Sequence, residues 1–400
     1  RLADGWNGDN SIKGRSHSFN IRSSTSMLIV SSILLTSFFT PSISFAGFLS
    51  SFSALHHRAT FQIPRMTSSL SAVAQRAREQ GLFRSTPLIR SIPLSQLANK
   101  NIYLKLDALQ ESGSFKDRGM AHLCANLLEQ GVKRLVSSSG GNAGLAVATI
   151  GKKLGMEVSV IVPQTTKPIV IEKLKSLGAD VTIHGENWNA ADKLARQRTE
   201  SDGASAYISP YDNPLLWTGH SSFIDELVEE IPKEEGNVGA VVVSVGGGGL
   251  ICGVLEGLER QGLSKTTVIA SETDGADSFG QAWKAGSLVT LPAITSVATS
   301  LGALEVTPFA IERAQKHQST GGAVESAVCT DAEAVNACVQ FAQDHRLLVE
   351  PACGAALAVV YSERLREKYL SNIEGPIIIE VCGGSGVNID LMMQWKTDFL

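Results

Sequence analysis

The chain has 400 residues, of which 43% are hydrophobic and 18% are charged. This length favours two or three domains, and the composition excludes a disordered or fibrous chain. Lys and Arg number 35 against 39 Asp and Glu, so the net charge of −4 leaves no broad basic field for nucleic acid. The six cysteines form no CxxC pair and no cluster with His, so we expect neither a disulfide framework nor a zinc site.

The first 65 residues differ from the rest, because Asn10–Arg78 contains no Asp or Glu. The apolar run Met27–Phe39 is shorter than the roughly 20 residues that span a membrane, so no membrane segment is expected. Three interpretations remain open: a mitochondrial leader, a secretory signal, and an extension added by gene translation ahead of Met66. We expect residues 1–65 to be disordered and the protein to be cytoplasmic, or mitochondrial if they are a genuine leader.

From Met66 onward, short β-branched runs alternate with segments of helical length. The predicted strands are Asn101–Asp107, Leu135–Ser139, Val158–Pro163, Ala179–His184, Ala240–Val245, Thr267–Glu272 and Pro376–Cys382. Helices are predicted over Lys116–Gln130 and Gly141–Leu154. Most of the strands are apolar throughout, which is typical of parallel sheets covered on both faces, so the fold class is α/β. Ligands of such folds bind at the carboxyl ends of the strands.

The loop Ser112–Gly119 places Lys116 at the start of a predicted helix. The positive end of the helix dipole disfavours a protonated amine at this position. A lysine with a lowered pKa can form an imine with an aldehyde. A solvated lysine in a first helical turn remains the plain alternative.

Two glycine-containing loops follow predicted strands. Ser137–Gly144 brings hydroxyls, an amide and free N–H groups to a helix N-terminus, which suits a carboxylate or phosphate, with a capped glycine turn as the alternative. Gly246–Leu250 contains four successive glycines whose N–H groups can form a nest for phosphate. It matches neither the dinucleotide fingerprint nor the Walker pattern, which favours a cofactor with a single phosphate over a flexible loop.

These three loops and Val381–Gly386 resemble those of the pyridoxal-phosphate enzymes of the tryptophan-synthase β group, known as fold type II. Within this group the chain is similar to eukaryotic L-serine/L-threonine dehydratases, including the run Val349–Ala358. The resemblance implies two doubly wound parallel-sheet domains with pyridoxal 5′-phosphate between them. The large domain would comprise residues 66–109 and 216–400, and the small domain residues 110–215.

The resemblance also implies roles for single residues. Lys116 would carry the cofactor as a Schiff base and take the Cα proton, and Ser139 lies in the loop that holds the substrate carboxylate. Phe115 would lie beside the pyridine ring, Asn142 would bind its 3′-oxygen, and Cys382 would face its nitrogen. The implied phosphate cradle is formed by Gly246, Gly247, Gly248, Gly249 and Leu250.

The implied reaction is β-elimination, which converts L-serine to pyruvate and ammonia and L-threonine to 2-oxobutyrate, in a homodimer that binds neither nucleic acid nor membrane. A neutral thiol at Cys382 would leave the ring nitrogen unprotonated, which favours loss of the hydroxyl over racemisation. Gly140 stands where serine racemases carry serine, which also argues against a racemase. Another fold-type II enzyme, such as a β-replacing synthase or racemase, and a cofactor-binding protein without turnover remain alternatives.

The resemblance further implies a site for a monovalent cation such as K+, bound mostly through carbonyl oxygens. Its ligands would be Glu272, Ala276, Ser278, Leu301 and Ala303. A capping or ion-paired carboxylate is the alternative interpretation of Glu272. Calcium or magnesium would require more carboxylates than this stretch offers.

Overall fold

The structure, a computed structural model of the chain, describes residues 72–200 and 202–400. The expectations for residues 1–65 therefore lie outside the described residues. The described residues belong to one compact unit. Within it, no helix is both long and apolar enough to cross a membrane.

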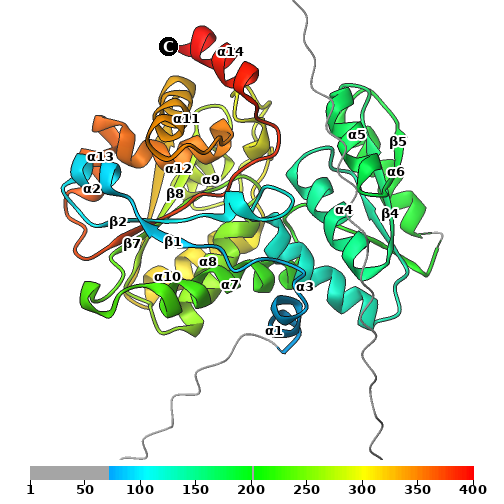
Figure 1. Ribbon diagram of the computed structural model, residues 1–400, viewed down its shortest axis with the longest axis horizontal. Coiled ribbons are helices and arrows are strands. Elements are labelled where there is room, and N and C mark those ends of the chain that lie inside the picture. Colours follow the sequence, from blue (N-terminus) through cyan, green and yellow to red (C-terminus); the bar gives the residue numbers. More distant parts are fainter. Residues whose placement is uncertain (1–71, 201) are drawn as a thin grey trace, which may run out of the picture. The chain divides into compact units, whose positions relative to one another are not determined.

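A six-stranded sheet has the strand order β1-β2-β10-β7-β8-β9 (Figure 1). Its strands are β1 (Leu88–Arg90), β2 (Ile102–Lys105), β7 (Ala240–Ser244), β8 (Thr267–Thr273), β9 (Ala323–Cys329) and β10 (Ile377–Glu380). All neighbours are parallel except β1, which runs antiparallel to β2 at the edge. In the centre, Ile378 of β10 lies opposite Tyr103 on one side and Val241 on the other.

A second, four-stranded sheet is parallel throughout and has the order β5-β4-β3-β6. Its strands are β3 (Arg134–Ser137), β4 (Glu157–Val162), β5 (Asp180–Ile183) and β6 (Ser205–Tyr207). This sheet falls inside the range proposed for the small domain, whose exact boundaries stay a prediction. Figure 1 shows the two sheets side by side, with α3 between them.

The helices alternate with the strands along the chain. They are α1 (Ala72–Glu79), α2 (Ile92–Ala98), α3 (Lys116–Glu129), α4 (Asn142–Leu154), α5 (Pro168–Ser176), α6 (Trp188–Glu200), α7 (Pro214–Glu230), α8 (Gly249–Arg260), α9 (Ser278–Ala285), α10 (Pro308–Ser319), α11 (Asp331–His345), α12 (Pro351–Tyr361), α13 (Glu363–Leu370) and α14 (Ile389–Phe399). Short 3-10 helices cover Asp107–Leu109, Lys233–Glu235 and Thr299–Leu301. The helix predicted from Lys116 ends one residue early, and Gly131 beyond it has a φ of 87°.

The central strands are apolar throughout because both faces of the large sheet are covered. Val241 and Val243 of β7 belong to a core shared with α7, α8 and α10. Ala240 and Val242, on the opposite face, belong to a second core shared with α11 and α12. The alternation of strand side chains therefore places consecutive valines in different cores.

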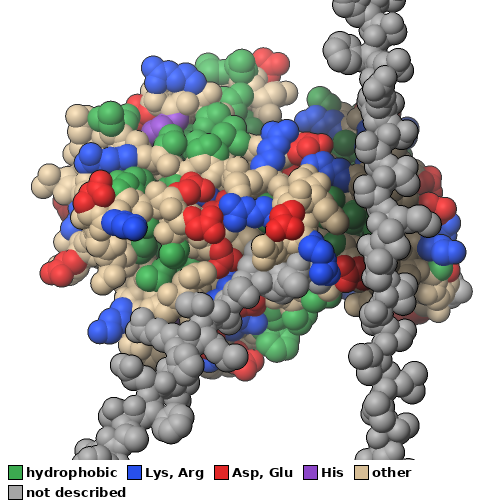
Figure 2. Space-filling view, turned by 60° about the horizontal axis from the view of Figure 1, so that its bottom comes forward, with side chains coloured by type: hydrophobic (Ala, Val, Ile, Leu, Met, Phe, Trp, Pro, Cys, Tyr) green, Lys and Arg blue, Asp and Glu red, His purple; other side chains and the backbone are tan. Residues whose placement is uncertain are grey.

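Three strands were not predicted. β1 and β6 are three residues long, too short for a periodic pattern. β9 is neither apolar throughout nor regularly alternating: Val324, Ala327 and Cys329 are buried, and Glu325 is exposed. On the face of the molecule in Figure 2, basic and acidic side chains lie interspersed, as a nearly balanced composition predicts.

Candidate active site

A cavity of about 520 Å³ lies where the carboxyl ends of strands from both sheets meet. Every residue predicted to act in catalysis or cofactor binding lines it: Phe115, Lys116, Ser139, Asn142, Gly246, Gly247, Gly248, Gly249, Leu250 and Cys382. These residues come from segments far apart in the chain. The arrangement agrees with the rule that α/β folds bind ligands at the carboxyl ends of their strands.

Lys116 occupies the first position of α3, after the N-cap residue Phe115. The N–H of Phe115 donates to the carbonyl of Cys382 (3.1 Å), which joins the start of the helix to the end of β10. The Lys116 Nζ donates to the carbonyl oxygen of Pro210 (2.7 Å) and lies 4.8 Å from the centre of the Phe115 ring. Removal of the amine from water lowers the pKa of Lys116 from 10.5 to about 8. The neutral, nucleophilic amine is then far more abundant near neutral pH than it is in a free lysine.

The tetraglycine loop connects β7 to the N-terminus of α8, and Gly248 has a φ of +91°. A Cβ at Gly247 would lie 2.2 Å from Cγ of Tyr211, and one at Gly246 would lie 3.0 Å from Cα of Leu301. Glycine is therefore required both for the backbone conformation and for the close approach of neighbouring segments. The loop presents the N-terminus of α8 to the cavity, a position that attracts anions.

The serine-rich loop is held by its own side chains. Ser139 Oγ accepts from the N–H of Gly141 (3.2 Å), and Ser137 Oγ accepts from the N–H of Ser139 (3.3 Å). Ser138 donates to Asp192 of α6 (2.7 Å), which also accepts from the Tyr207 hydroxyl. Ser139 is thus fixed at the N-terminus of α4, where a carboxylate would be favoured.

Gly140 has little room for a side chain. A Cβ at this position would lie 3.0 Å from Cγ2 of Thr166 and 3.3 Å from Cγ1 of Val162. Both contacts are tighter than ordinary van der Waals packing, so a serine here would require Thr166 to shift. The space around Gly140 therefore favours glycine over serine at this position.

Both ends of the Asn142 side-chain amide are hydrogen-bonded. Its Nδ2 donates to Glu350 (3.1 Å), and its Oδ1 accepts from the N–H and the hydroxyl of Ser385 (both 2.9 Å). Glu350 lines the cavity and was missed by sequence reasoning, as were Ser300, Pro210 and Tyr211. Glu350 could have been found from the sequence as an acidic residue directly before Pro351, at the start of α12. It also lies within the run Val349–Ala358, which resembles the dehydratases.

Cys382 follows β10 and is buried. A hydrogen bond with Cys353, burial and the nearby charge of Glu350 raise the pKa of the Cys382 thiol well above its usual range. The thiol is therefore neutral at physiological pH, as the sequence interpretation requires. All six cysteines lie among the described residues, buried and without disulfide bonds.

The five residues implied as cation ligands lie around β8, α9 and the Thr299–Leu301 turn. In the structure, the Glu272 carboxylate accepts from the N–H groups of Phe279 (2.8 Å) and Gly280 (2.7 Å) at the start of α9. This is the capping arrangement considered as the alternative. Burial raises the pKa of Glu272 well above its usual range. The cation site remains a prediction.

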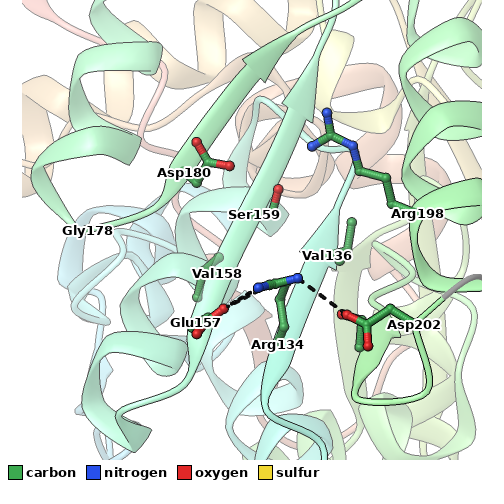
Figure 3. Close-up of a pocket in the computed structure, with 10 residues that line it drawn as sticks. Arg134, Val136, Glu157, Val158, Ser159, Gly178, Asp180, Arg198 and Asp202 are labelled. Carbon is green, nitrogen blue, oxygen red and sulfur yellow. Dashed lines mark hydrogen bonds and ion pairs between the residues drawn. The ribbon is translucent and has the colours of Figure 1, made fainter.

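A separate cavity of about 570 Å³ lies at the opposite, amino-terminal edge of the small sheet (Figure 3). Arg134 bridges Glu157 (2.6 Å) and Asp202 (3.3 Å) across its floor. None of the predicted site residues lines this cavity. Figure 3 shows Arg134 pairing with both carboxylates, and all the predicted catalytic and cofactor-binding residues line the cavity at the carboxyl edge instead.

The fold and the cavity at its strand ends define a cofactor-dependent α/β enzyme, and comparison with known proteins identifies its family. The model for the family described as "Pyridoxal-phosphate dependent enzyme" matches residues 80–383. This chain therefore belongs to the pyridoxal-phosphate-dependent enzymes.

Several relatives are similar over nearly their full length. The L-serine dehydratase/L-threonine deaminase of Mus musculus is 44% identical, and the match covers 80% of this chain and 97% of the relative. The L-serine dehydratase of Saccharomyces cerevisiae is 40% identical, with coverages of 76% and 94%. The structure of a fungal L-serine ammonia-lyase from Rhizomucor miehei aligns with a TM-score of 0.73 at 30% identity, covering 80% of this chain and 99% of that one. Maize serine racemase shares the fold (TM-score 0.71, 24% identity, coverages of 82% and 96%).

The residues around the cavity fit pyridoxal 5′-phosphate. Lys116 offers an amine of lowered pKa, and the glycine loop offers the N-terminus of α8 for a phosphate. The hydroxyl of Ser244 lines the same cavity and lies within hydrogen-bonding reach of the Cys382 thiol.

Proposed function

We propose that this protein is an L-serine dehydratase, which converts L-serine to pyruvate and ammonia and also accepts L-threonine, giving 2-oxobutyrate. The observation that carries the proposal is the Lys116 amine, placed in one cavity with a glycine cradle for phosphate and a neutral Cys382 thiol. The similarity to L-serine dehydratases over most of their length supports the same assignment. The reaction balances, because serine first loses water and the resulting enamine then takes up water and releases ammonia.

When bound, the cofactor supplies an aldehyde that links to the amine and a ring that withdraws electrons from Cα. Lys116 then acts as the base, because an amine with a pKa of about 8 can both accept and release a proton near neutral pH. The Ser139 loop and the N-terminus of α4 bind the carboxylate of the substrate. Asn142 would hold the 3′-oxygen of the ring through its second Nδ2 hydrogen.

Elimination is favoured over racemisation by two features of the site. A neutral thiol at Cys382 would not hold a proton on the nitrogen of a bound pyridine ring, and the moderate electron withdrawal that results would favour loss of the hydroxyl. Racemisation also needs an acid on the face opposite Lys116, and Gly140 has no side chain to supply one.

Product analysis tests this function. Purified enzyme loaded with cofactor is expected to form pyruvate and ammonia from L-serine in equal amounts without any added nucleophile. Lys116→Ala should lose the absorbance of the lysine-bound cofactor and nearly all turnover, because nucleophile and base are the same amine. Formation of D-serine as the main product, or product formation only with an added nucleophile, would identify a different enzyme of the same fold. A lysine-bound cofactor that does not react with serine would identify a binding protein.

The assembly and location are proposed with the function: a homodimer in the cytoplasm. Both are carried over from the resemblance of the sequence motifs to the dehydratase family. Sedimentation of the purified enzyme tests the first, and fractionation of cells from its source tests the second. Recovery from mitochondria in a shortened form would instead identify residues 1–65 as a leader.

A further inference from the structure

Glu350 is a buried carboxylate inside the cavity, at the N-cap position of α12, and only 7% of its surface is exposed. Its carboxylate accepts hydrogen bonds from three uncharged donors. Asn142 Nδ2 (3.1 Å) and Ser300 Oγ (2.5 Å) donate to Oε2, and the N–H of Gly386 (2.6 Å) donates to Oε1. A buried carboxylate requires such donors, since it would otherwise lose its hydration without compensation. The contacts join α4, the Thr299–Leu301 turn and the loop after β10 at one group.

Two of the glycines that follow Cys382, Gly384 and Gly386, pack directly against this carboxylate. A Cβ at Gly384 would lie 2.2 Å from Cδ of Glu350, and one at Gly386 would lie 2.8 Å from its Oε1. Gly384 also has a φ of +128°, which side chains rarely tolerate. Close approach of the loop to Glu350 therefore explains both glycines.

The same contacts determine which way the Asn142 amide points. An Asn side chain has one acceptor oxygen and two N–H donors. Its Oδ1 faces two donors on Ser385, and one Nδ2 hydrogen faces the Glu350 carboxylate. The reversed amide would set its oxygen against a carboxylate oxygen and its N–H groups against the N–H of Ser385. Only the observed orientation satisfies all partners, and it leaves the second Nδ2 hydrogen available.

We infer that Glu350 is a positioning residue of the active site: its carboxylate fixes the Asn142 amide so that the free Nδ2 hydrogen is offered to the 3′-oxygen of the bound cofactor. The inference rests on the proposed function for the identity of that cofactor contact. Hydrogen bonding to this oxygen stabilises its negatively charged form, which is the form that absorbs at longer wavelength in the lysine-bound cofactor.

The test is Glu350→Gln, studied as resting holoenzyme without substrate. A glutamine amide cannot accept from Asn142, Ser300 and Gly386 at once, because one of its two ends is a donor. We expect the ratio of long- to short-wavelength absorbance of the bound cofactor to fall, and the dissociation constant for pyridoxal phosphate to rise about tenfold. This is the effect of losing a hydrogen bond worth about 1.4 kcal/mol. An unchanged absorbance ratio and affinity in folded protein would overturn the inference.

Cys338→Ala is the matched control, because Cys338 Sγ contacts the carbonyl of Glu350 (3.3 Å) but not its carboxylate. It should lower the melting temperature and leave the absorbance ratio unchanged; a change equal to that of Glu350→Gln would reduce Glu350 to a packing role. If Glu350→Gln does not fold, Glu350→Asp decides, because the shorter side chain keeps the charge but withdraws the carboxylate from Asn142 Nδ2. An unchanged ratio in Glu350→Asp would then overturn the inference. Failure of the wild-type enzyme to convert serine would refute the proposed reaction alone.

Discussion

The pKa of Lys116 is lowered because its amine is removed from water, and the amine contacts a carbonyl instead of a carboxylate. Pro210 supplies that carbonyl from the segment between β6 and α7. The sequence pointed to the helix dipole as the cause of a lowered pKa, whereas burial is the larger cause in the folded chain. A carboxylate at the same distance would have stabilised the ammonium form and raised the pKa.

The pH dependence of cofactor loading tests this environment. We expect the rate at which cofactor-free enzyme takes up pyridoxal phosphate to rise with pH around a midpoint near 8, because only the neutral amine attacks the aldehyde. A free lysine analogue under the same conditions should show a midpoint near 10.5. Coincident midpoints for enzyme and analogue would contradict a buried amine.

Cys382 allows a test of reaction choice. Cys382→Asp would place a carboxylate at the end of β10, hold a proton on the ring nitrogen and strengthen electron withdrawal. Pyruvate formation should slow, while transamination or racemisation rises relative to it. Cys382→Ser should behave nearly as the wild type, since a hydroxyl is also neutral.

The deciding measurement for Cys382 is the ratio of pyruvate formed to cofactor lost as its amine form. An unchanged ratio in Cys382→Asp with cofactor still bound would exclude the proposed effect of Cys382 on the choice of reaction. A larger loss of activity in Cys382→Ser than in Cys382→Asp would show that the thiol acts as a small buried hydrophobe.

At the level of elements, the link between β7 and α8 is the predicted anion site, and its glycines allow close contacts with neighbouring segments as well as a positive φ at Gly248. Gly247→Ala should weaken cofactor binding about tenfold to a hundredfold, because the new Cβ collides with the Tyr211 ring and relief of such overpacking costs about 1–3 kcal/mol. Fluorescence titration of cofactor-free enzyme measures this. Gly203→Ala is the control, since a Cβ there meets nothing within 4 Å, and equal effects of the two variants would rule out the collision.

At the scale of the whole molecule, a buried ion network joins β2 of the large sheet and the turn after it to α3 and α7. Arg118 of α3 bonds Asp107 after β2 (2.7 and 2.8 Å) and Glu226 of α7 (2.7 and 2.8 Å) in paired contacts. Lys105 of β2 also reaches Glu226 (2.8 Å). Burial alone would raise the pKa of Glu226, but Arg118 and Lys105 outweigh it and lower the pKa to about 2.

Glu226→Gln should reduce the free energy of unfolding by about 3–5 kcal/mol at neutral pH, because Arg118 and Lys105 lose a buried counter-charge. In the wild type the stabilisation from Glu226 is present above its ordinary pKa of 4.5 and is lost as the pH falls toward 2. Denaturant titrations at pH 7 and at lower pH measure both effects. Glu229→Gln, on an exposed pair with Arg78, should change stability by less than about 1 kcal/mol, and similar losses in the two variants would argue against the network.

The sequence by itself determined the features that local chemistry specifies. Glycines and a lysine at strand-to-helix junctions identified the three loops, and apolar runs located seven strands, because backbone conformation and two-sided burial leave local patterns. It did not reveal β1, β6 and β9, whose pairing depends on neighbours already in place.

Only the tertiary structure decided how these parts act on one another. Glu350 and Asn142 are 208 residues apart in the chain, and no periodicity links them. The same is true of Arg118 and Glu226, 108 residues apart. A hydrogen bond or ion pair in the interior depends on distance and on exclusion of water, which the folded arrangement alone creates.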